Sequence, residues 1–150
     1  GWLCAEESLI AELEKIKDSY NVSRLAQAAA LAAVLDKTEF EKRRDEIVNN
    51  RNFLTEGLGR LGFETLPSST NFIFTRPPAD LRTLSQRGET AAGAYYRLLL
   101  EKKILVRYWS SEKLKEWIRI TIGTRADMEK LLSTTDSIVS LAKGELISSQ

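Results

Sequence analysis

The sequence predicts an α+β domain in which a small antiparallel or mixed sheet has helices packed mainly on one face. Helical and strand patterns follow one another as helices, a strand pair, a helix, a second strand pair and a final helix. The strand candidates are short and rich in β-branched and aromatic residues. A length of 150 residues, with 43% hydrophobic and 29% charged residues, suits one globular domain large enough to bury a core.

The first part of the chain is predicted to be helical. Apolar residues at helical spacing predict one helix over Glu6–Lys17 and a second, alanine-rich helix over Leu25–Leu35. Ser23 is placed to cap the second helix, and the small side chains of that helix lead us to expect that it is buried. Thr38 and Glu41 have the spacing of a capping box, which predicts the start of a long third helix.

The third helix carries an apolar residue at every seventh position. This repeat suits a coiled-coil partner or a helix lying across a sheet, and we expect the latter. The repeating residues are Phe40, Ile47, Leu54 and Leu61. The helix ends in Gly57–Gly62, a literal G-x-G-x-x-G preceded by a helix and followed by a strand. A dinucleotide site needs the reverse order, so we interpret these glycines as helix-terminating residues.

The remaining chain holds the predicted sheet and two more helices. Strands are predicted at Phe63–Leu66, Asn71–Thr75, Ile104–Arg107 and Trp117–Ile122. Helices are predicted over Tyr95–Lys103 and over Ala126–Lys143, the second opened by Thr124 and Asp127. The polar stretch Ala79–Gly93 contains two glycines, and we expect it to be a mobile loop whose role the sequence leaves open.

Composition excludes several classes of function. The 22 basic and 21 acidic residues give a net charge of +1, which argues against binding of nucleic acid or of an anionic membrane. The chain has no histidine, so imidazole bases and histidine metal sites are excluded. With one cysteine it can form neither an internal disulfide nor a zinc cluster, and we expect a cytoplasmic, reducing compartment.

The two last strands carry the most informative pattern. In Trp117–Ile122 three isoleucines alternate with Trp, Arg and Thr, so the isoleucines face the core and Arg119 faces outward. If the two strands form a hairpin with matched buried faces, Val106 lies opposite Ile120 and Arg107 lies opposite Arg119. Two facing guanidinium groups can donate forked hydrogen bonds to a phosphate or a carboxylate.

Other interpretations remain open at this point. Arg107 and Arg119 can instead extend separately into water, or pair with Glu101 or Glu116, and the residues alone do not decide between these and an anion site. Tyr20 and Asn21 lie in a loop between helices, where they can line a pocket or simply form a turn. Asn71, at the start of a strand, is open to the same two interpretations.

Four segments together resemble a known family. They are Lys17–Ser23 (KDSYNVS) before an Ala/Gln-rich helix, Ser69–Phe74 (STNFIF), Ile104–Arg107 (ILVR) and Ile118–Thr124 (IRITIGT). In this order they are similar to the C-terminal part of histidinol-phosphate aminotransferases, which are pyridoxal-phosphate enzymes of the aspartate aminotransferase fold. The resemblance covers nearly the whole chain but only the small domain of such an enzyme.

The resemblance implies roles for particular residues. Arg119 would bind the anionic group of the substrate, Arg107 would assist at the phosphate, and Tyr20, Asn21 and Asn71 would line the substrate pocket. The lysine that holds pyridoxal 5'-phosphate would lie before the chain begins, so we expect no cofactor-binding or catalytic residue in this chain. We therefore expect the chain alone to be inactive and to bind no cofactor.

The resemblance also implies a domain division and partners. Gly1–Ala5 (GWLCA) would be the remnant of a large-domain strand, and residues 6–150 the small domain; a strand of the domain's own sheet is the alternative. The chain begins with glycine, and we expect it to be a piece of a longer, cytoplasmic homodimeric enzyme of histidine biosynthesis acting on small phosphate and carboxylate substrates. Ser19, where many relatives have proline, and the length of Ala79–Gly93 depart from the family pattern.

Two other functions remain as alternatives. A related decarboxylase of the same fold, acting on a phosphorylated amino acid, would also need an arginine pair. A non-catalytic α+β module that senses an anionic metabolite would need the same pair and no upstream lysine. No metal, nucleic acid or membrane is expected as a partner in any of these cases.

Overall fold

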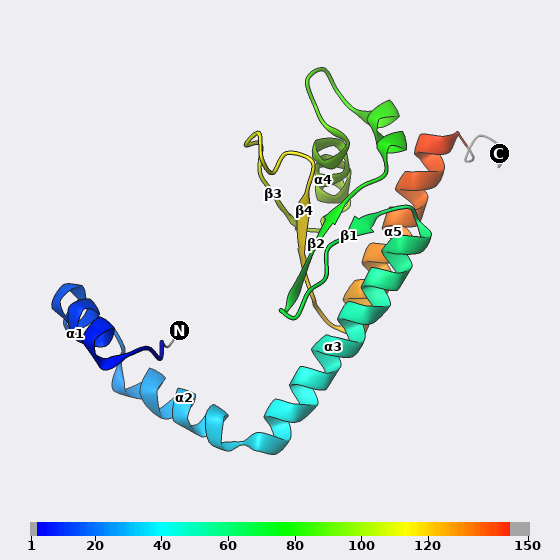
Figure 1. Ribbon diagram of the computed structural model, residues 1–150. Helices are drawn as coiled ribbons and strands as arrows, with labels where there is room; N and C mark the ends of the chain where they lie inside the picture. The colour runs from blue at the N-terminus through cyan, green and yellow to red at the C-terminus, as the bar shows by residue number, and fades with distance from the viewer. Residues whose placement is uncertain (1–2, 145–150) are drawn as a thin grey trace. The chain divides into compact units, whose positions relative to one another are not determined.

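The structure, a computed structural model, describes residues 3–144 and divides into two compact units, Gly1–Glu41 and Lys42–Gln150 (Figure 1). Gly1 and Trp2 of the predicted terminal strand lie outside the described residues, and Leu3–Ala5 form no strand, so these three residues do not extend the domain's own sheet. The boundary between residues 5 and 6 stays a prediction. The structure places its own boundary after Glu41.

The first unit contains α1 (Glu7–Ile16) and α2 (Arg24–Leu35). Ser23 caps α2 as predicted, because its Oγ accepts a hydrogen bond from the backbone N–H of Ala26. The expectation that α2 is buried is wrong: Leu25 is 80% exposed and Val34 is 70% exposed. No element of this unit packs over the described α2, so its apolar side chains remain uncovered.

Helix α3 (Lys37–Arg60) begins two residues earlier than the predicted capping box of Thr38 and Glu41 would place it. The backbone N–H of Glu39 donates to Oδ1 of Asp36, so Asp36 rather than Thr38 provides the side-chain cap. At the other end the chain leaves the helix through Gly62, whose φ of +85° favours glycine. Gly62 is therefore a helix-terminating residue as predicted, whereas the same prediction is wrong for Gly57 and Gly59, which both lie inside the helix.

The sheet has four short antiparallel strands in the order β1-β2-β4-β3. They are β1 (Glu64–Thr65), β2 (Phe72–Arg76), β3 (Arg107–Tyr108) and β4 (Ile118–Thr121). The predicted first and last strand pairs are both present, and β2 and β4 bring them together at the centre of the sheet. The predicted bounds of the third strand, Ile104–Arg107, are wrong, because β3 shares only Arg107 with them. The antiparallel sheet of the predicted α+β class is thereby confirmed.

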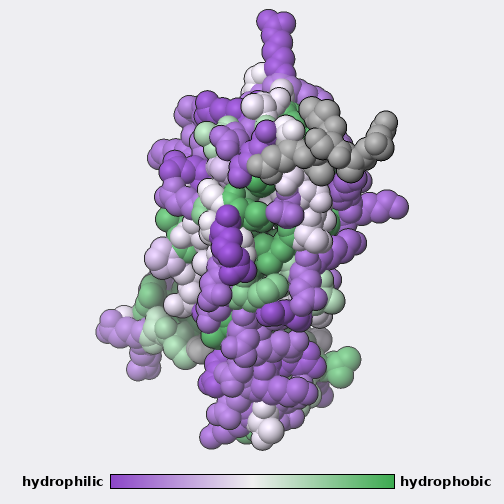
Figure 2. Space-filling view, turned by 90° about the vertical axis from the view of Figure 1, so that its right-hand side faces the viewer, coloured by the Kyte–Doolittle hydropathy of each residue, from purple (hydrophilic) through white to green (hydrophobic). Residues whose placement is uncertain are grey.

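Helices cover one face of this sheet. Besides α3 they are η1 (Ala79–Leu84), α4 (Ala91–Glu101) and α5 (Arg125–Lys143). Their apolar residues form one core with the inward side chains of the strands; its fully buried members include Leu54, Leu58, Ile73, Leu81, Tyr95, Leu99 and Ile118. The helical side seen in Figure 2 is mainly hydrophilic, as expected for helices whose apolar stripes face a core.

The prediction that Ala79–Gly93 is a mobile loop is wrong in part, because η1 and the start of α4 lie within this segment. Arg97 fixes the segment between them by donating hydrogen bonds to the Glu89 carboxylate and, at 2.9 Å, to the carbonyl of Leu84. In contrast, the capping box predicted for the last helix is confirmed: Thr124 and Asp127 cap α5 reciprocally. None of the helices within residues 3–144 combines the length and apolar character that crossing a membrane requires.

Candidate anion-binding site

Arg107 and Arg119 lie opposite each other on neighbouring strands. Strands β3 and β4 pair Arg107 with Arg119, which confirms the predicted register. Ile118 and Ile120, on either side of Arg119, are 0% and 2% exposed and point into the core. Because side chains alternate along a strand, Arg119 projects from the face that the helices leave uncovered.

Trp109 brings the two guanidinium groups to the same place. The Cζ of Arg107 lies 5.3 Å from the centroid of the Trp109 ring, and the Cζ of Arg119 lies 5.7 Å from it. Arg119 also lies over the ring of Phe72, at 5.2 Å. These distances are within the range of cation–π attraction, so both arginines project from one side of the sheet and share one aromatic neighbour.

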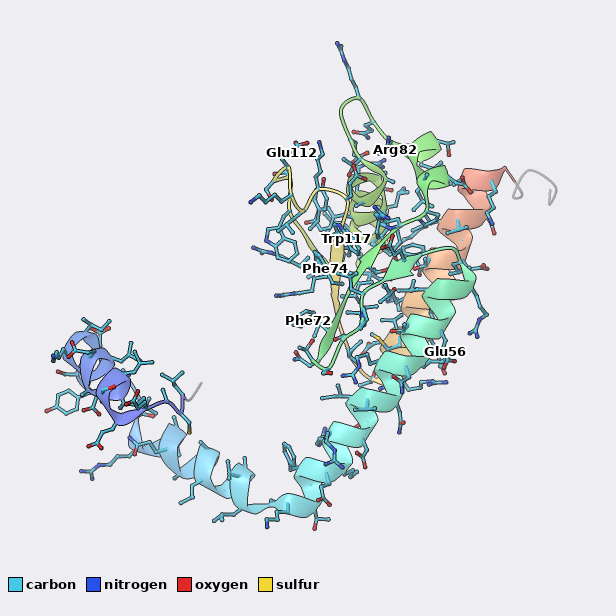
Figure 3. The ribbon with its side chains drawn as sticks, in the orientation of Figure 1. Glu56, Phe72, Phe74, Arg82, Glu112 and Trp117 are labelled. Carbon is cyan, nitrogen blue, oxygen red and sulfur yellow. The ribbon has the colours of Figure 1, made fainter. Side chains whose placement is uncertain are left out.

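Further aromatic rings continue this surface. Phe74, the strand partner of Arg119, packs edge-on against Trp109 at 6.2 Å and stacks on Trp117 at 5.1 Å with an interplanar angle of 9°. Figure 3 shows Phe72, Phe74 and Trp117 along the side of β2 and β4 away from α3. We call Phe72, Phe74, Arg107, Trp109, Trp117 and Arg119 the aromatic–arginine face.

Neither arginine of this face has an acidic partner among the described residues. Glu101 pairs with Arg97 at 3.1 Å and Glu116 pairs with Arg82 at 3.5 Å, so the pairing of Arg107 or Arg119 with these acids is not found. The Nε of Arg119 is buried and has no hydrogen-bond acceptor within residues 3–144. A buried charged donor without an acceptor is costly, which favours an anion supplied from outside as its partner.

The neighbouring Arg76 provides a useful contrast. It also lies over an aromatic ring, that of Trp117, at 5.4 Å, but its guanidinium forms an ion pair with Glu64. A carboxylate of β1 therefore neutralises the charge of Arg76, whereas the N–H donors of Arg107 and Arg119 remain available to bind an anion. A phosphate or carboxylate is the chemical class that two such forked donors recognise.

The other predicted site residues lie outside strands β3 and β4. Tyr20 is 100% exposed and adopts a positive φ of 59°, and Asn21 beside it is exposed; both lie in the first unit. Asn71 precedes β2, where its backbone carbonyl accepts a hydrogen bond from the N–H of Ile122 at 2.9 Å. Its exposed side chain forms no hydrogen bond to either arginine among the described residues.

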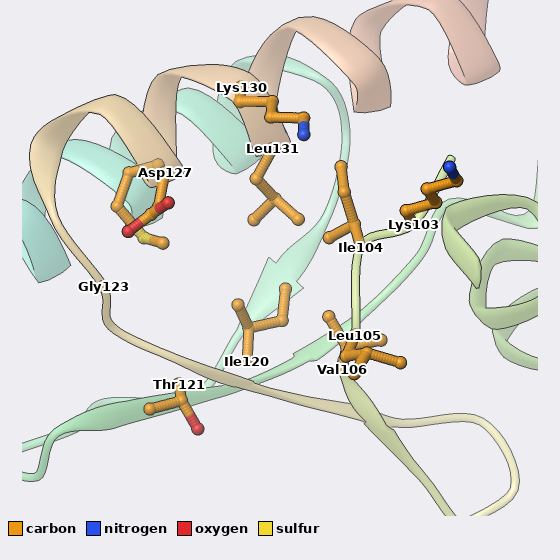
Figure 4. Close-up of a pocket in the computed structure, with 11 residues that line it drawn as sticks. Lys103, Ile104, Leu105, Val106, Ile120, Thr121, Gly123, Asp127, Lys130 and Leu131 are labelled. Atoms are coloured by element: carbon orange, nitrogen blue, oxygen red, sulfur yellow. The ribbon is translucent and has the colours of Figure 1, made fainter. Parts of the chain in front are cut away.

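A separate pocket of about 350 Å³ lies between α5 and the segment that enters β3 (Figure 4). Val106, Ile120 and Leu131 form its apolar wall, so it opens from the helical side of the sheet and not from the aromatic–arginine face. Within the described residues no group of three or more acidic or cysteine side chains is arranged to hold a metal ion.

Sequence reasoning missed the aromatic members of the site. Trp109 lies two residues after Arg107, and Trp117 lies two residues before Arg119, so strand alternation places each on the same face as its arginine. The same alternation, applied to Phe72 and Phe74, indicates the third strand of that face. This signal was present in the sequence, but it became decisive only when the strand order β2-β4-β3 was known.

Comparison with known proteins adds independent information. The family described as aminotransferase class I and II matches residues 1–134. The chain is 37% identical over 142 residues to histidinol-phosphate aminotransferase 2 of Rhizobium meliloti, covering 93% of this chain and 38% of that protein. It is 39% identical over 132 residues to histidinol-phosphate aminotransferase of Geotalea daltonii, covering 88% and 35%.

Solved structures agree with these relatives. Histidinol-phosphate aminotransferase from Sinorhizobium meliloti, in complex with pyridoxal-5'-phosphate, superimposes with a TM-score of 0.73 at 25% identity, over 89% of this chain and 34% of that one. A decarboxylase from Sulfurospirillum multivorans shares the fold, with a TM-score of 0.68 at 20% identity, over 89% of this chain and 37% of that one. This chain spans little more than a third of the length of these proteins. On the family match over residues 1–134, the chain belongs to the class I and II aminotransferases.

Proposed function

We propose that this chain is the C-terminal, small-domain part of a pyridoxal-phosphate-dependent enzyme that transfers an amino group between histidinol phosphate and a 2-oxo acid. The family membership and the two histidinol-phosphate aminotransferases at 37% and 39% identity support this proposal. It also explains why, in the described part of the chain, Arg107 and Arg119 lie together on one face of the sheet without an acidic partner.

The arginine pair is assigned to the anionic group of the substrate. The observation that carries this assignment is the buried Arg119 Nε without an acceptor, in a guanidinium that shares the Trp109 ring with Arg107. Arg119 would bind the phosphate by forked hydrogen bonds and Arg107 would complete the contact from the neighbouring strand. The carboxylate of the 2-oxo acid would use the same donors when the second substrate enters.

Binding of the remote anion serves the reaction at the amine. A phosphate held on a rigid sheet fixes one end of the substrate, so the reacting amine has fewer orientations to explore. The free energy gained at the phosphate is thereby used to position the amine for transfer. In this proposal the sheet domain contributes binding and orientation, and the chemical step takes place against the rest of the enzyme.

The cofactor is assigned to the rest of the protein. When bound there, pyridoxal phosphate would supply the chemistry that carries the amino group between the two substrates. A lysine that attaches it needs a lowered pKa, whereas hydrogen bonding to Glu112 raises the pKa of Lys115 above its usual value. Every other lysine in residues 3–144 is exposed to solvent. The lysines present therefore do not fit the attachment site, and we expect the chain alone to be inactive.

The same proposal gives Tyr20, Asn21 and Asn71 a place at the substrate pocket, and it makes the complete enzyme a cytoplasmic homodimer. The exposure of Tyr20 and of the apolar side chains of α1 and α2 supports it, because such surfaces suit contact with the parts of an enzyme that this chain does not contain. The apolar side chains in question are Leu9, Leu13, Ile16, Leu25, Leu31, Val34 and Leu35.

The test uses the longer protein that contains this chain, assayed with histidinol phosphate and 2-oxoglutarate. We expect amine transfer, and we expect Arg119→Ala to lower kcat/KM about 10-fold to 100-fold, the loss expected for a charged hydrogen bond to substrate. Arg76→Ala is the matched control and should stay within about twofold, because Arg76 already pairs with Glu64.

Three results would contradict the proposal in whole or in part. Release of carbon dioxide from a phosphorylated amino acid, without amine transfer, would identify a decarboxylase of the same fold. A protein that binds phosphate but catalyses neither reaction would favour the anion-sensing module. Equal losses in Arg119→Ala and Arg76→Ala would remove the arginine pair from the substrate site even if amine transfer is observed.

A further inference from the structure

Trp109 occupies a particular position in the aromatic–arginine face, because it contacts both members of the arginine pair. Its ring centroid lies 5.3 Å from the Cζ of Arg107 and 5.7 Å from the Cζ of Arg119. Phe72 contacts Arg119, and Trp117 contacts the carboxylate-paired Arg76. Of the aromatic residues in the described chain, Trp109 is therefore the one that joins the two strands through both arginines.

Two like charges in directly opposed strand positions repel each other. Without an acid between them, the guanidinium groups of Arg107 and Arg119 lower their energy by moving apart into solvent. The negative face of an indole ring attracts both cations and opposes that separation. The ring itself is held in place, because Phe74 packs edge-on against Trp109 and is stacked on Trp117.

We propose that Trp109 is a positioning residue that holds the Arg107 and Arg119 guanidinium groups close enough to bind one phosphate together, and so favours phosphate over carboxylate at this site. This inference rests on the anion site of the proposed function. A phosphate offers more acceptor oxygens than a carboxylate and can satisfy both forks at once, whereas a carboxylate is satisfied by one bidentate arginine. Loss of Trp109 therefore weakens phosphate binding more than carboxylate binding.

The experiment titrates the complete 150-residue chain with inorganic phosphate and, separately, with acetate, and follows the arginine Nε resonances by NMR. Trp109→Leu removes the π face and should weaken phosphate binding about fivefold while acetate binding changes by less than about twofold. Trp109→Phe keeps a π face and should recover most of the phosphate affinity. If Trp109→Leu unfolds the chain, Trp109→Met replaces it, because methionine fills more of the volume without an aromatic ring.

Phe53→Leu is the matched control. The Phe53 ring lies 3.3 Å from the Cζ of Arg125, which also donates to Glu129, so this variant removes a cation–π contact of a carboxylate-paired arginine. It should leave phosphate and acetate binding unchanged. A general loss of stability would instead weaken binding in both variants in proportion to their unfolding midpoints, and that result would overturn the positioning role.

The remaining outcomes separate the two proposals. Phosphate affinity unchanged in Trp109→Leu, or equal losses for phosphate and acetate, overturns the role of Trp109 and leaves the anion site intact. A wild-type chain that shows no shift of the Arg119 Nε resonance with phosphate overturns the anion site and the inference together. Amine transfer by the longer protein, without phosphate binding at this pair, overturns the inference and leaves only the reaction class.

Discussion

The two faces of the sheet are formed by the same strands, but one is buried against helices and the other is partly exposed. On the inner face Ile73, Ile118 and Ile120 are buried against helices and contribute to one apolar core. On the outer face Phe74 and Arg119 alternate with those residues and keep part of their surface exposed. Stability is therefore expected to depend on the inner face, and anion binding on the outer face.

One alternating pattern of side chains therefore determines both the buried face of a strand and its exposed face. A strand residue on the inner face is constrained by shape and volume, whereas its neighbour on the outer face is free to carry charge and aromatic surface. Substitutions at adjacent positions should then have separable effects. Residues 118 and 119 provide the sharpest test, because they are neighbours on β4 and project to opposite sides.

The largest expected change in stability is for Ile118→Ala, since Ile118 is fully buried. Removal of its outer carbons leaves a cavity beneath the helices, and the free energy of unfolding should fall by about 2–5 kcal/mol. Urea denaturation followed by circular dichroism measures this difference. Arg119→Ala should change the same quantity by less than about 1 kcal/mol; a loss as large as that of Ile118→Ala would contradict the separation of the faces.

A smaller change in stability is expected for Tyr95→Phe, in the helical layer below the inner face. The buried Tyr95 hydroxyl lies 2.7 Å from the Oγ1 of Thr135, which itself donates to the carbonyl of Leu131. The tyrosine hydroxyl is therefore the donor, and its loss should cost about 1 kcal/mol near neutral pH, measured by urea denaturation.

The difference in stability between the wild type and Tyr95→Phe should also depend on pH in the alkaline range. Burial raises the pKa of the Tyr95 hydroxyl well above its usual value, because the charged form loses its solvation in the core. The unfolded chain loses this proton at about pH 10, while the folded protein keeps it. The contribution of Tyr95 to the free energy of unfolding is therefore fully present below that pH and decreases above it. The wild type should therefore lose up to about 1 kcal/mol per pH unit more than Tyr95→Phe above about pH 10. Parallel curves for the two proteins would contradict a buried, neutral Tyr95.

The sequence was sufficient to predict the fold class and the Arg107–Arg119 register, because isoleucine alternation determines which face of each strand is buried. It was not sufficient for α2, whose small and apolar side chains predicted a buried helix that the structure leaves exposed. Periodicity identifies an apolar face but does not say which segment covers it. Likewise, Asp36 displaced the predicted Thr38 cap because both residue types can cap a helix and only the backbone decides.

The site could be predicted from the sequence only where the alternation of side chains along a strand determines which residues share a face. The position of Arg107 opposite Arg119 follows from this alternation. The contact of Trp109 with both arginines, in contrast, depends on the order of three strands. The proposed roles of Tyr20 and Asn21 depend on surfaces outside this chain, and local sequence contains no information on those surfaces. Their exposure is nonetheless what such a role requires.

The most direct test of the account is a double-mutant cycle for phosphate binding, measured by calorimetry on the complete chain with Arg107→Ala, Arg119→Ala and the double variant. If the two guanidinium groups hold one phosphate together, each single variant loses most of the affinity. The product of the two single losses then exceeds the loss in the double variant by about threefold or more. Losses that multiply independently, or affinity unchanged in either single variant, would contradict a shared anion site.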